Sequence, residues 1–515
     1  MSLFDRSVPL NIRSDSFDVV GKNFDEIPIW MPEAHGGFGD IMVTLKLAEG
    51  LKKEFPEKRV KVYFGQIEDY EKVRRLYPNF SPKKLEETLN GISVARIRPY
   101  DALRMRESLV RIFSPVAAFK YGNPYTFVMT SGINFYLEEY DCRESIRLPN
   151  LTENQVYVDK NGRKHLVLPT GFEEKSIGIH IDSSLTELDN RITPEIKERI
   201  LEEANFGWIR DYVPRLMESE WGFAYYCNDD SFRTNSARLN LLKALIKSFE
   251  ATGNWERAIT IFDFSNVQFP NKEVSRGAYF NEPFRDVFYN SGDVEVILGD
   301  GSKFGKVAPN VNIVHVGMQN HSTFLDFLRY SQIPVAITGD ASLAEAVSLR
   351  KPFVYHPPTW KTLVFPHLVE RAPDLLENLD DINNVRSWYG CKKIKTMTEN
   401  DELKRFYLRN RSRILSDRLD CFDEALKLFG NRGNFAIKMA ASYVREGEEA
   451  ELRILKKASI FGAFCGIGGN EKLQRLFYDQ RHLNSFERLN QRLIQKMDIA
   501  KNLADLIREA VKSSV

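Results

Sequence analysis

Two short loops of this sequence contain residues whose types and spacing could do chemistry. The first is the run HGGFGD at residues 35–40, which lies between an apolar stretch and an amphipathic one. Glycines such as Gly37 and Gly39 let the backbone turn tightly and approach a ligand closely. A helix that follows such a loop directs its free N–H groups and its positive dipole end at the loop. Asp40 is therefore either an ordinary N-cap or a general base that faces a substrate.

The second loop is the run TGDASLAE at residues 338–345, again between a strand-like and a helix-like stretch. Gly339 permits the turn, and Ser342 could hold diphosphate oxygens together with the first amides of the helix. Asp340 or Glu345 could accept hydrogen bonds from the hydroxyls of a ribose or a sugar. The same residues also suit a helix start without a ligand, because Asp is a favoured N-cap and an acidic first turn stabilises a helix.

Residues elsewhere in the second half of the chain could complete a nucleotide site. Phe223 and Tyr225 could stack on a nucleobase, although aromatic side chains at the end of a strand are equally typical of a core. Gln319 and His321 precede a helical stretch, where they could cap the helix or contact a base or a diphosphate. Lys361 could contact a phosphate, although most lysines are only solvated.

Sequence motifs of metal and redox chemistry are missing from the chain. The first loop lacks the GxGxxG spacing of dinucleotide-binding folds, which argues against an oxidoreductase. No Asp-x-Asp triplet occurs, and the five cysteines form no CxxC pair, so that neither a metal-dependent transferase nor a zinc site is indicated. We therefore expect no metal and no cofactor.

The overall composition indicates a globular protein of two or three domains. The chain has 515 residues, of which 43% are hydrophobic and 28% charged. Its 72 Lys and Arg residues balance 71 Asp and Glu residues, which argues against a protein that wraps nucleic acid. No apolar run of about 18 residues or more predicts a membrane span. The N-terminus lacks a secretory signal and the cysteines lie far apart, so we expect a cytoplasmic protein, with later export as an effector left open.

The order of the predicted elements favours two parallel sheets with helical crossovers. The first half begins with a strand at 27–30, a helix at 40–55, a strand at 60–65 and a helix that ends near Pro78. The stretch 100–175 is less regular, and strand character returns at 176–183. After a polar, helical connector, strands are predicted at 221–227, 257–264, 294–299, 311–317, 334–339 and 352–356, with helices at 236–253, 321–332 and 341–351.

We accordingly predict an α/β fold with two Rossmann-like, doubly wound domains and a C-terminal helical segment. The first domain spans 1–215 with an insertion near 100–175, the second spans 216–430, and the helical tail spans 431–515. Both loops then leave the carboxyl ends of strands, which is the edge where ligands bind in such sheets. The apolar stripe between Phe486 and Ile507 favours a helix packed on a core over a helix that binds a membrane or a partner.

With these residues in place, the chain resembles glycosyltransferases of the GT-B fold over about residues 27–430. The run GGFGDIMVTLKLAEGL resembles the loop and first helix of inverting enzymes such as the heptosyltransferases, where an Asp after Gly serves as the base. This resemblance implies that role for Asp40. It also implies that the first domain holds the acceptor and the second domain the nucleotide sugar.

The run from FAYY through TGDASLAEAVSLRKPFVYH resembles the bacterial protein-arginine rhamnosyltransferases that modify elongation factor P. There, aromatic residues hold the base and a Gly-acid-x-Ser turn holds the diphosphate and assists catalysis, which implies such roles for Phe223, Tyr225, Gln319, Asp340 and Ser342. That family has a second Asp four residues before the loop Asp, where this chain has Gly36. The acceptor is therefore left open, a protein side chain being one of the options.

The function expected from this resemblance is metal-independent, inverting transfer of a hexosyl or deoxyhexosyl group from a nucleotide-diphosphate sugar. Asp40 would remove the acceptor's proton, and helix N-termini would take the charge of the leaving diphosphate in place of a metal. Two alternatives remain open. A nucleotide-sugar 2-epimerase would use the same two-domain arrangement, and a non-catalytic protein of the GT-B fold would use the insertion or the tail to bind a partner.

Overall fold

The architecture is taken from a computed structural model of the chain, which divides into two compact units. The first unit comprises Met1–Arg238, Glu256–Val364 and Asn490–Val515, and the second comprises Leu239–Trp255 and Phe365–Leu489. Both sheets belong to the first unit, and the domain boundaries predicted at 215 and 430 stay predictions. The structure describes residues 25–31, 39–77, 79–96, 111–113, 126–130, 155–158, 164–169, 171–172, 176–204, 213–225, 258–264, 294–297, 303–305, 311–316, 319–355, 374–388, 401–415, 422–429 and 480–512, together with residues 368, 371, 372, 437, 440, 441, 443 and 447.

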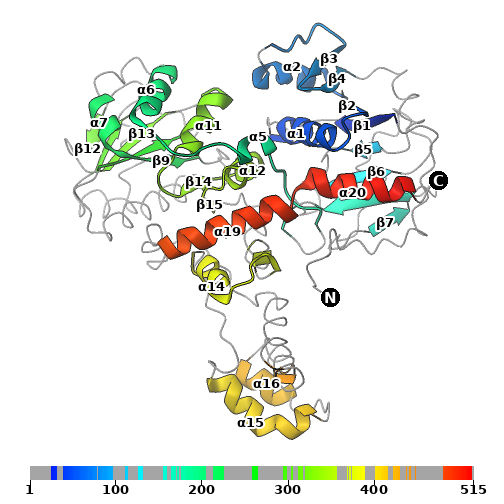
Figure 1. The fold of residues 1–515 in the computed structure, drawn as a ribbon, viewed down its shortest axis with the longest axis vertical. Coiled ribbons are helices and arrows are strands. Elements are labelled where there is room, and N and C mark those ends of the chain that lie inside the picture. Colours follow the sequence, from blue (N-terminus) through cyan, green and yellow to red (C-terminus); the bar gives the residue numbers. More distant parts are fainter. Residues whose placement is uncertain are drawn as a thin grey trace. The chain divides into compact units, whose positions relative to one another are not determined.

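The first sheet has a parallel centre with antiparallel strands on both sides (Figure 1). Strands β4, β2, β1 and β5 run parallel in that spatial order. Strand β3 pairs antiparallel with β4, and β6, β8 and β7 continue antiparallel beyond β5. The strands are β1 (Glu26–Met31), β2 (Arg59–Phe64), β3 (Glu86–Leu89), β4 (Ile92–Arg96), β5 (Arg111–Phe113), β6 (Thr126–Thr130), β7 (Gln155–Val158) and β8 (Lys164–Pro169).

The strand order of this sheet reverses next to β1. From β1 the chain moves outward through β2 to β4, and it then returns to place β5 on the other side of β1. The predicted insertion near 100–175 thus supplies β5 and the antiparallel strands that widen the sheet. Ligands of open parallel sheets bind outside the carboxyl ends of the strands at such a reversal. The glycine loop that contains Gly37 follows directly on β1.

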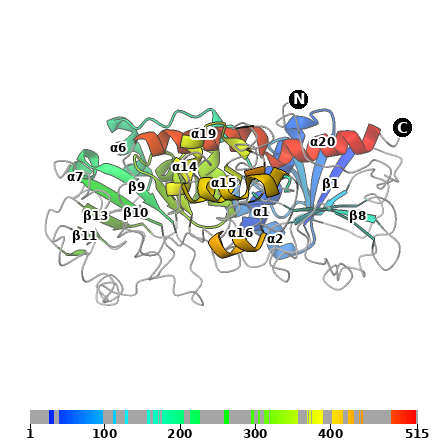
Figure 2. The same cartoon turned by 90° about the horizontal axis from the view of Figure 1, so that it is seen from below.

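Three helices are associated with this sheet: α1 (Gly39–Glu54), α2 (Ile67–Leu76) and the C-terminal helix α20 (Ile499–Lys512). The predicted helical periodicity of α1 is confirmed, since Ile41, Leu45 and Leu51 are completely buried. Helix α20 packs along α1, and its apolar side chains belong to the same core as β1 and β2 (Figures 1 and 2). The C-terminal stripe is therefore the apolar face of helices packed on a core, as the favoured interpretation held.

The stretch 176–183 is not the strand that its alternating isoleucines predict. Ile179 forms one isolated parallel bridge with Asp498, through hydrogen bonds to Met497 and Ile499 at the junction of two C-terminal helices. The buried isoleucines gave a strand-like pattern because the segment is covered on both faces, but it joins neither sheet. At Gly178 (φ 105°) a Cβ atom would lie 2.1 Å from the carbonyl oxygen of Met497, so that only glycine fits this close approach.

The second sheet is parallel except at one edge, in the order β12-β11-β13-β10-β9-β14-β15. Its strand order also reverses, here between β9 and β14, because the chain runs outward from β9 to β10 and later returns to place β14 on the other side. Six of its strands were predicted: β9 (Glu220–Ala224), β10 (Ile259–Asp263), β11 (Val294–Ile297), β13 (Val311–His315), β14 (Val335–Ile337) and β15 (Phe353–Tyr355). The antiparallel edge strand β12 (Lys303–Gly305) was not predicted.

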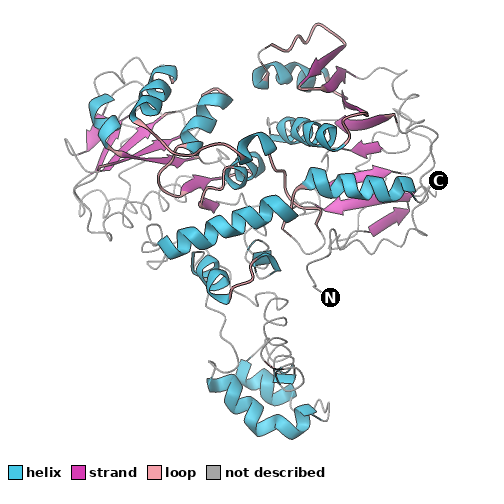
Figure 3. Cartoon of the chain, viewed as in Figure 1, coloured by secondary structure: helices cyan, strands magenta, loops and turns pink. Residues whose placement is uncertain are grey.

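The helices of the second sheet begin at well-defined caps. Helix α11 (His321–Arg329) is capped by Asn320, whose side chain accepts a hydrogen bond from the backbone of Thr323 at 2.9 Å. Helix α12 (Asp340–Ser348) begins after Gly339, whose φ of 81° is a conformation that glycine adopts readily. The remaining helices of this part, drawn with the sheet in Figure 3, are α5 (Ser183–Thr186), α6 (Pro194–Glu203) and α7 (Val213–Glu218).

The second unit is helical in the parts that are described. Helix α19 begins in this unit, where the carboxylate of Asp381 accepts hydrogen bonds from Ser485 at 2.7 Å and from Arg488 at 2.8 Å. Leu403 and Phe406 are buried on the inner face of α15. The helices are α14 (Leu379–Trp388), α15 (Asp401–Leu415), α16 (Phe422–Phe429) and α19 (Gln480–Lys496).

Candidate functional site

The first predicted loop lies at the strand reversal of the first sheet. Gly39 and Asp40 are the first two residues of α1, which follows β1. Gly37 and the side chain of Asp40 lie outside the described residues, so the contacts of the expected base stay untested. In the sequence the loop lies between α1 and β1, the strand at which the order reverses.

The second predicted loop lies at the strand reversal of the second sheet. Gly339 makes the turn after β14 and Asp340 begins α12, although the side chain of Asp340 is not among the described ones. The buried hydroxyl of Ser342 donates a hydrogen bond to the carbonyl of Thr338. Ser342 therefore fastens the loop to its own helix, and its hydroxyl would have to leave that carbonyl before it could donate to a phosphate.

The two predicted aromatic residues differ in their surroundings. Phe223 is completely buried and packs against Phe264 and Phe324, with ring centroids 5.0 Å away in both cases. This side chain is part of the core of the second sheet. Tyr225, two residues later, is only half-buried and meets the ring of Phe324 edge-on at 5.2 Å. Of the pair, Tyr225 is the less buried residue.

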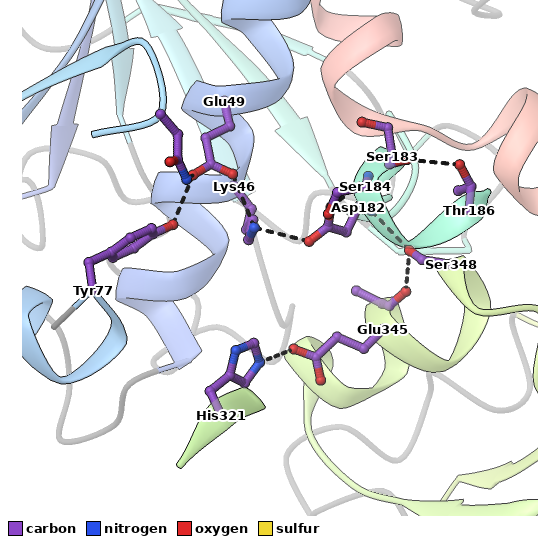
Figure 4. Close-up of polar contacts among 12 residues, drawn as sticks. Lys46, Glu49, Tyr77, Asp182, Ser183, Ser184, Thr186, His321, Glu345 and Ser348 are labelled. Atoms are coloured by element: carbon purple, nitrogen blue, oxygen red, sulfur yellow. Dashed lines mark hydrogen bonds and ion pairs between the residues drawn. The ribbon is translucent and has the colours of Figure 1, made fainter. Parts of the chain in front are cut away.

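His321 and Glu345, which the sequence singles out separately, contact each other directly. The Nε2 atom of His321, at the start of α11, lies 2.6 Å from a carboxylate oxygen of Glu345, in the second turn of α12 (Figure 4). Nearby, the side-chain amide of Gln319 donates to the carbonyl of Val316 at 3.3 Å. Lys361 lies outside the described residues.

A polar network that the sequence did not reveal joins α1 to α12. The ammonium of Lys46 lies 3.0 Å from the carboxylate of Asp182 and 3.1 Å from that of Glu49 (Figure 4). The backbone N–H of Asp182 donates to the hydroxyl of Ser348, the last residue of α12, at 2.9 Å. Tyr77 completes the network with a 2.9 Å hydrogen bond to Glu49. The two helices also pack against each other.

The ionisation of this network follows from its burial and its pairing. Burial alone would raise the pKa of Asp182, but Lys46 and the donors of Ser184 outweigh it and hold that pKa below the ordinary value. Burial likewise opposes the charge of Lys46, yet Asp182 and Glu49 raise its pKa overall. Both charges are therefore present at neutral pH, and the side chains are only 18% and 13% exposed. Such a pair fixes the helices that carry it.

Metal and membrane sites are not found in the described part of the chain. Among those residues, no group of three or more His, Cys, Asp or Glu side chains could hold a metal ion. The helices in the described ranges are all too short or too polar to cross a bilayer.

The residues that this structure adds to the predicted set are Lys46, Asp182 and Ser348. A signal for Asp182 exists in the sequence, because an Asp before two serines is a typical N-cap, and its side chain does accept the Ser184 N–H at 3.0 Å. No local signal pairs it with Lys46. The sequence matches no family model and no curated protein.

Proposed function

We propose that this protein is an inverting glycosyltransferase that moves a sugar from a nucleotide-diphosphate sugar to an acceptor. One observation carries the proposal. Two sheets with parallel centres each reverse their strand order, and a predicted ligand loop follows β1 at the first reversal and β14 at the second. The helices that begin at these loops, α1 and α12, pack against each other. Two loops suited to ligands are thereby connected through adjacent helices.

The donor would bind at the second loop. The free N–H groups at the start of α12 and the turn at Gly339 suit the oxygens of a diphosphate. Tyr225, which follows β9 on the other side of the same reversal, offers a half-buried ring for stacking on the base. As the bond between the sugar C1 and the diphosphate breaks, its electron pair would pass to the diphosphate oxygen. Helix amides would stabilise that charge without a metal.

The acceptor would bind at the first loop, with Asp40 as the general base. Asp40 would take the proton of the acceptor's nucleophilic atom while that atom forms its bond to C1 from the face opposite the diphosphate. The Lys46–Asp182–Ser348 network supports this division of labour, because it connects the helix that begins with Asp40 to the helix that begins with Asp340. General-base catalysis is typically worth about 10²–10⁴-fold.

The first test is binding followed by turnover. The full chain is screened by thermal shift against UDP, GDP, ADP and dTDP and the corresponding sugar nucleotides, since a ligand at about 100 times its Kd stabilises by about 2.7 kcal/mol. Release of nucleoside diphosphate from the sugar nucleotide that binds is then measured with wild type, Asp40→Asn and Glu68→Gln. Glu68 is a matched control, because it is an exposed acid in the first turn of another helix, α2.

The proposal predicts a loss of about 10²–10⁴-fold in turnover for Asp40→Asn with donor affinity kept, and wild-type turnover for Glu68→Gln. Conversion of the sugar itself, without transfer to water or an acceptor, would instead identify a nucleotide-sugar 2-epimerase. If no nucleotide shifts the melting temperature, the proposal fails and the result favours a non-catalytic interaction protein.

A further inference from the structure

The side chains of His321 and Glu345 join α11 to α12 beside the second sheet. Their facing atoms, Nε2 and Oε1, lie 2.6 Å apart (Figure 4). The Glu345 side chain is 9% exposed, and that of His321 is 31% exposed. The carboxylate is thus the inner member of the pair and the imidazole the outer member. A ligand at this edge of the sheet would meet the imidazole first.

The burial of Glu345 requires a partner for its charge. A buried carboxylate costs several kcal/mol unless it is paired and hydrogen-bonded, and His321 is the side-chain partner that the structure provides. A carboxylate at this distance accepts a hydrogen bond from Nε2 and so fixes the orientation of the ring. It also stabilises a ring that carries protons on both nitrogens, as an Asp does for the histidine of a catalytic triad.

The ring of His321 is held from two further directions. It stacks at an interplanar angle of 15° and a centroid distance of 6.4 Å on Phe324, which also meets Tyr225 edge-on. Asn320 caps the helix at the preceding residue and so fixes the backbone of His321. With Nε2 engaged by Glu345, Nδ1 is the ring nitrogen that remains for a ligand, since no hydrogen bond to it is made from the described residues.

We infer that His321 contacts the donor's diphosphate through Nδ1 and that Glu345 is a positioning residue that acts through His321. This inference rests on the proposed function and deepens it. It also replaces the earlier expectation that Glu345 accepts hydrogen bonds from the donor's hydroxyls. As the C1–oxygen bond breaks, the electron pair goes to the diphosphate oxygen and the acceptor's proton goes to Asp40. The diphosphate oxygen accepts a hydrogen bond from the Nδ1–H of a His321 ring that carries a proton on each nitrogen, the other proton being donated to Glu345. The ligand class is a nucleoside diphosphate rather than a monophosphate.

The experiment compares diphosphate with monophosphate binding by calorimetry. Wild type, His321→Gln, Glu345→Gln and the double variant are titrated with UDP, GDP, ADP and dTDP, and then with the monophosphate of the nucleoside that binds best. His321→Gln should weaken diphosphate binding by about 10- to 100-fold, the range of a charge-assisted hydrogen bond. Monophosphate binding should change by less than about threefold. A purely structural role would weaken both ligands alike.

The double variant tests whether Glu345 acts through His321. Glu345→Gln should weaken diphosphate binding by less than His321→Gln does, and the double variant should lose no more than His321→Gln alone. Glu68→Gln, an exposed acid in the first turn of α2, is the control and should bind both ligands as wild type does. Additive losses in the double variant, or equal losses for both ligands, would overturn the inference.

A second measurement needs no variant and keeps the inference testable if a substitution unfolds the chain. The ring resonances of His321 in the wild-type protein should shift when the diphosphate is added and stay in place when the monophosphate is added. Failure of the wild type to bind any nucleoside diphosphate contradicts the proposed function. Diphosphate binding that leaves the His321 resonances unmoved contradicts only the assignment of His321.

Discussion

At the scale of single residues, the least usual environment belongs to His180. Both of its ring nitrogens are buried, and neither has a hydrogen-bond partner among the described residues. Burial lowers the pKa of this histidine to about 4; Asp182 and Glu49 oppose the shift, while Lys46 adds to it. The neutral ring is the form that the folded chain accommodates, two residues from the carboxylate of the Lys46–Asp182 pair.

The lowered pKa of His180 predicts a specific acid sensitivity. In the unfolded chain the ring takes up its proton near pH 6.5, whereas in the folded chain it does so only near pH 4. Its contribution to stability is therefore complete above about pH 6.5 and is lost as the pH falls towards 4, at about 1.4 kcal/mol per pH unit. Between these limits the free energy of unfolding of wild type should fall by about 3 kcal/mol more than that of His180→Phe, as measured by urea denaturation. If the free energies of unfolding of wild type and His180→Phe change with pH in the same way, the prediction is contradicted.

The Lys46–Asp182 pair predicts a loss of stability when one partner is removed. Lys46→Met leaves the carboxylates of Asp182 and Glu49 largely buried without their cation, and it should lower the free energy of unfolding by about 1–3 kcal/mol. Asp182→Asn should lower the free energy of unfolding less in the Lys46→Met background than in wild type. Denaturant titration of wild type, the two single variants and the double variant measures this difference. Arg199→Gln, from an exposed ion pair, is the control and should change stability by less than about 1 kcal/mol. If Asp182→Asn lowers the free energy of unfolding equally with and without Lys46, the two residues are not coupled.

At the scale of elements, the contact between α1 and α20 depends on one glycine. A Cβ atom added to Gly50 would lie 2.5 Å from the Cβ of Ala500, closer than two side chains can approach. The absence of a side chain at Gly50 lets the two helices meet at this point. Helix propensity disfavours glycine here by about 1 kcal/mol, and packing overrides it.

Gly50→Ala should therefore destabilise the protein although it improves the intrinsic propensity of α1. We expect a net loss of about 1–3 kcal/mol in the free energy of unfolding, because overpacking forces the helices apart. Ala500→Gly in the same chain removes the clashing methyl group and should restore part of the loss. The prediction is contradicted if Gly50→Ala is as stable as wild type, or if adding Ala500→Gly lowers the free energy of unfolding further.

At the scale of the whole molecule, the C-terminal end of the chain completes the core next to its first strand. Ile499, Leu503 and Ile507 of α20 are buried in the same cluster as Ile29 and Val62 of β1 and β2. The isolated bridge between Ile179 and Asp498 holds the junction before α20 in place. The core beside the first sheet therefore combines side chains of β1 and β2 with side chains of α20.

Deletion of residues 498–515 should accordingly prevent stable folding of the first sheet. The deletion exposes the apolar side chains of α1 that α20 covers, at about 25 cal/mol for each Å² exposed. We expect an aggregated product, or one without a cooperative thermal transition by circular dichroism. Removal of residues 513–515 alone, beyond the end of α20, is the control and should leave the transition unchanged. A cooperative transition at the wild-type temperature after the longer deletion would show that α20 is dispensable.

The elements were predictable wherever neighbours in the chain decide the structure. The stripe at Ile41, Leu45 and Leu51 predicts a helix over 40–55, and α1 spans Gly39–Glu54. The apolar runs of the second half coincide with β9, β10, β13, β14 and β15. The segment 176–183 shows the limit of this reasoning: its isoleucines alternate as in a strand, but the partner that covers them comes from the far end of the chain.

The candidate site divides in the same way. By itself the sequence placed the starts of α1 and α12 to within one residue, because turn and helix propensities depend on a few consecutive residues. It did not identify the caps: Asp40 is the second residue of α1, and the N-cap of α12 is Gly339 rather than Asp340. Only the tertiary structure brought Asp182 to Ser348, 166 positions away, and His321 to Glu345, 24 positions away. Such contacts depend on strand order and on the points at which helices cross. No periodicity within one element contains that information.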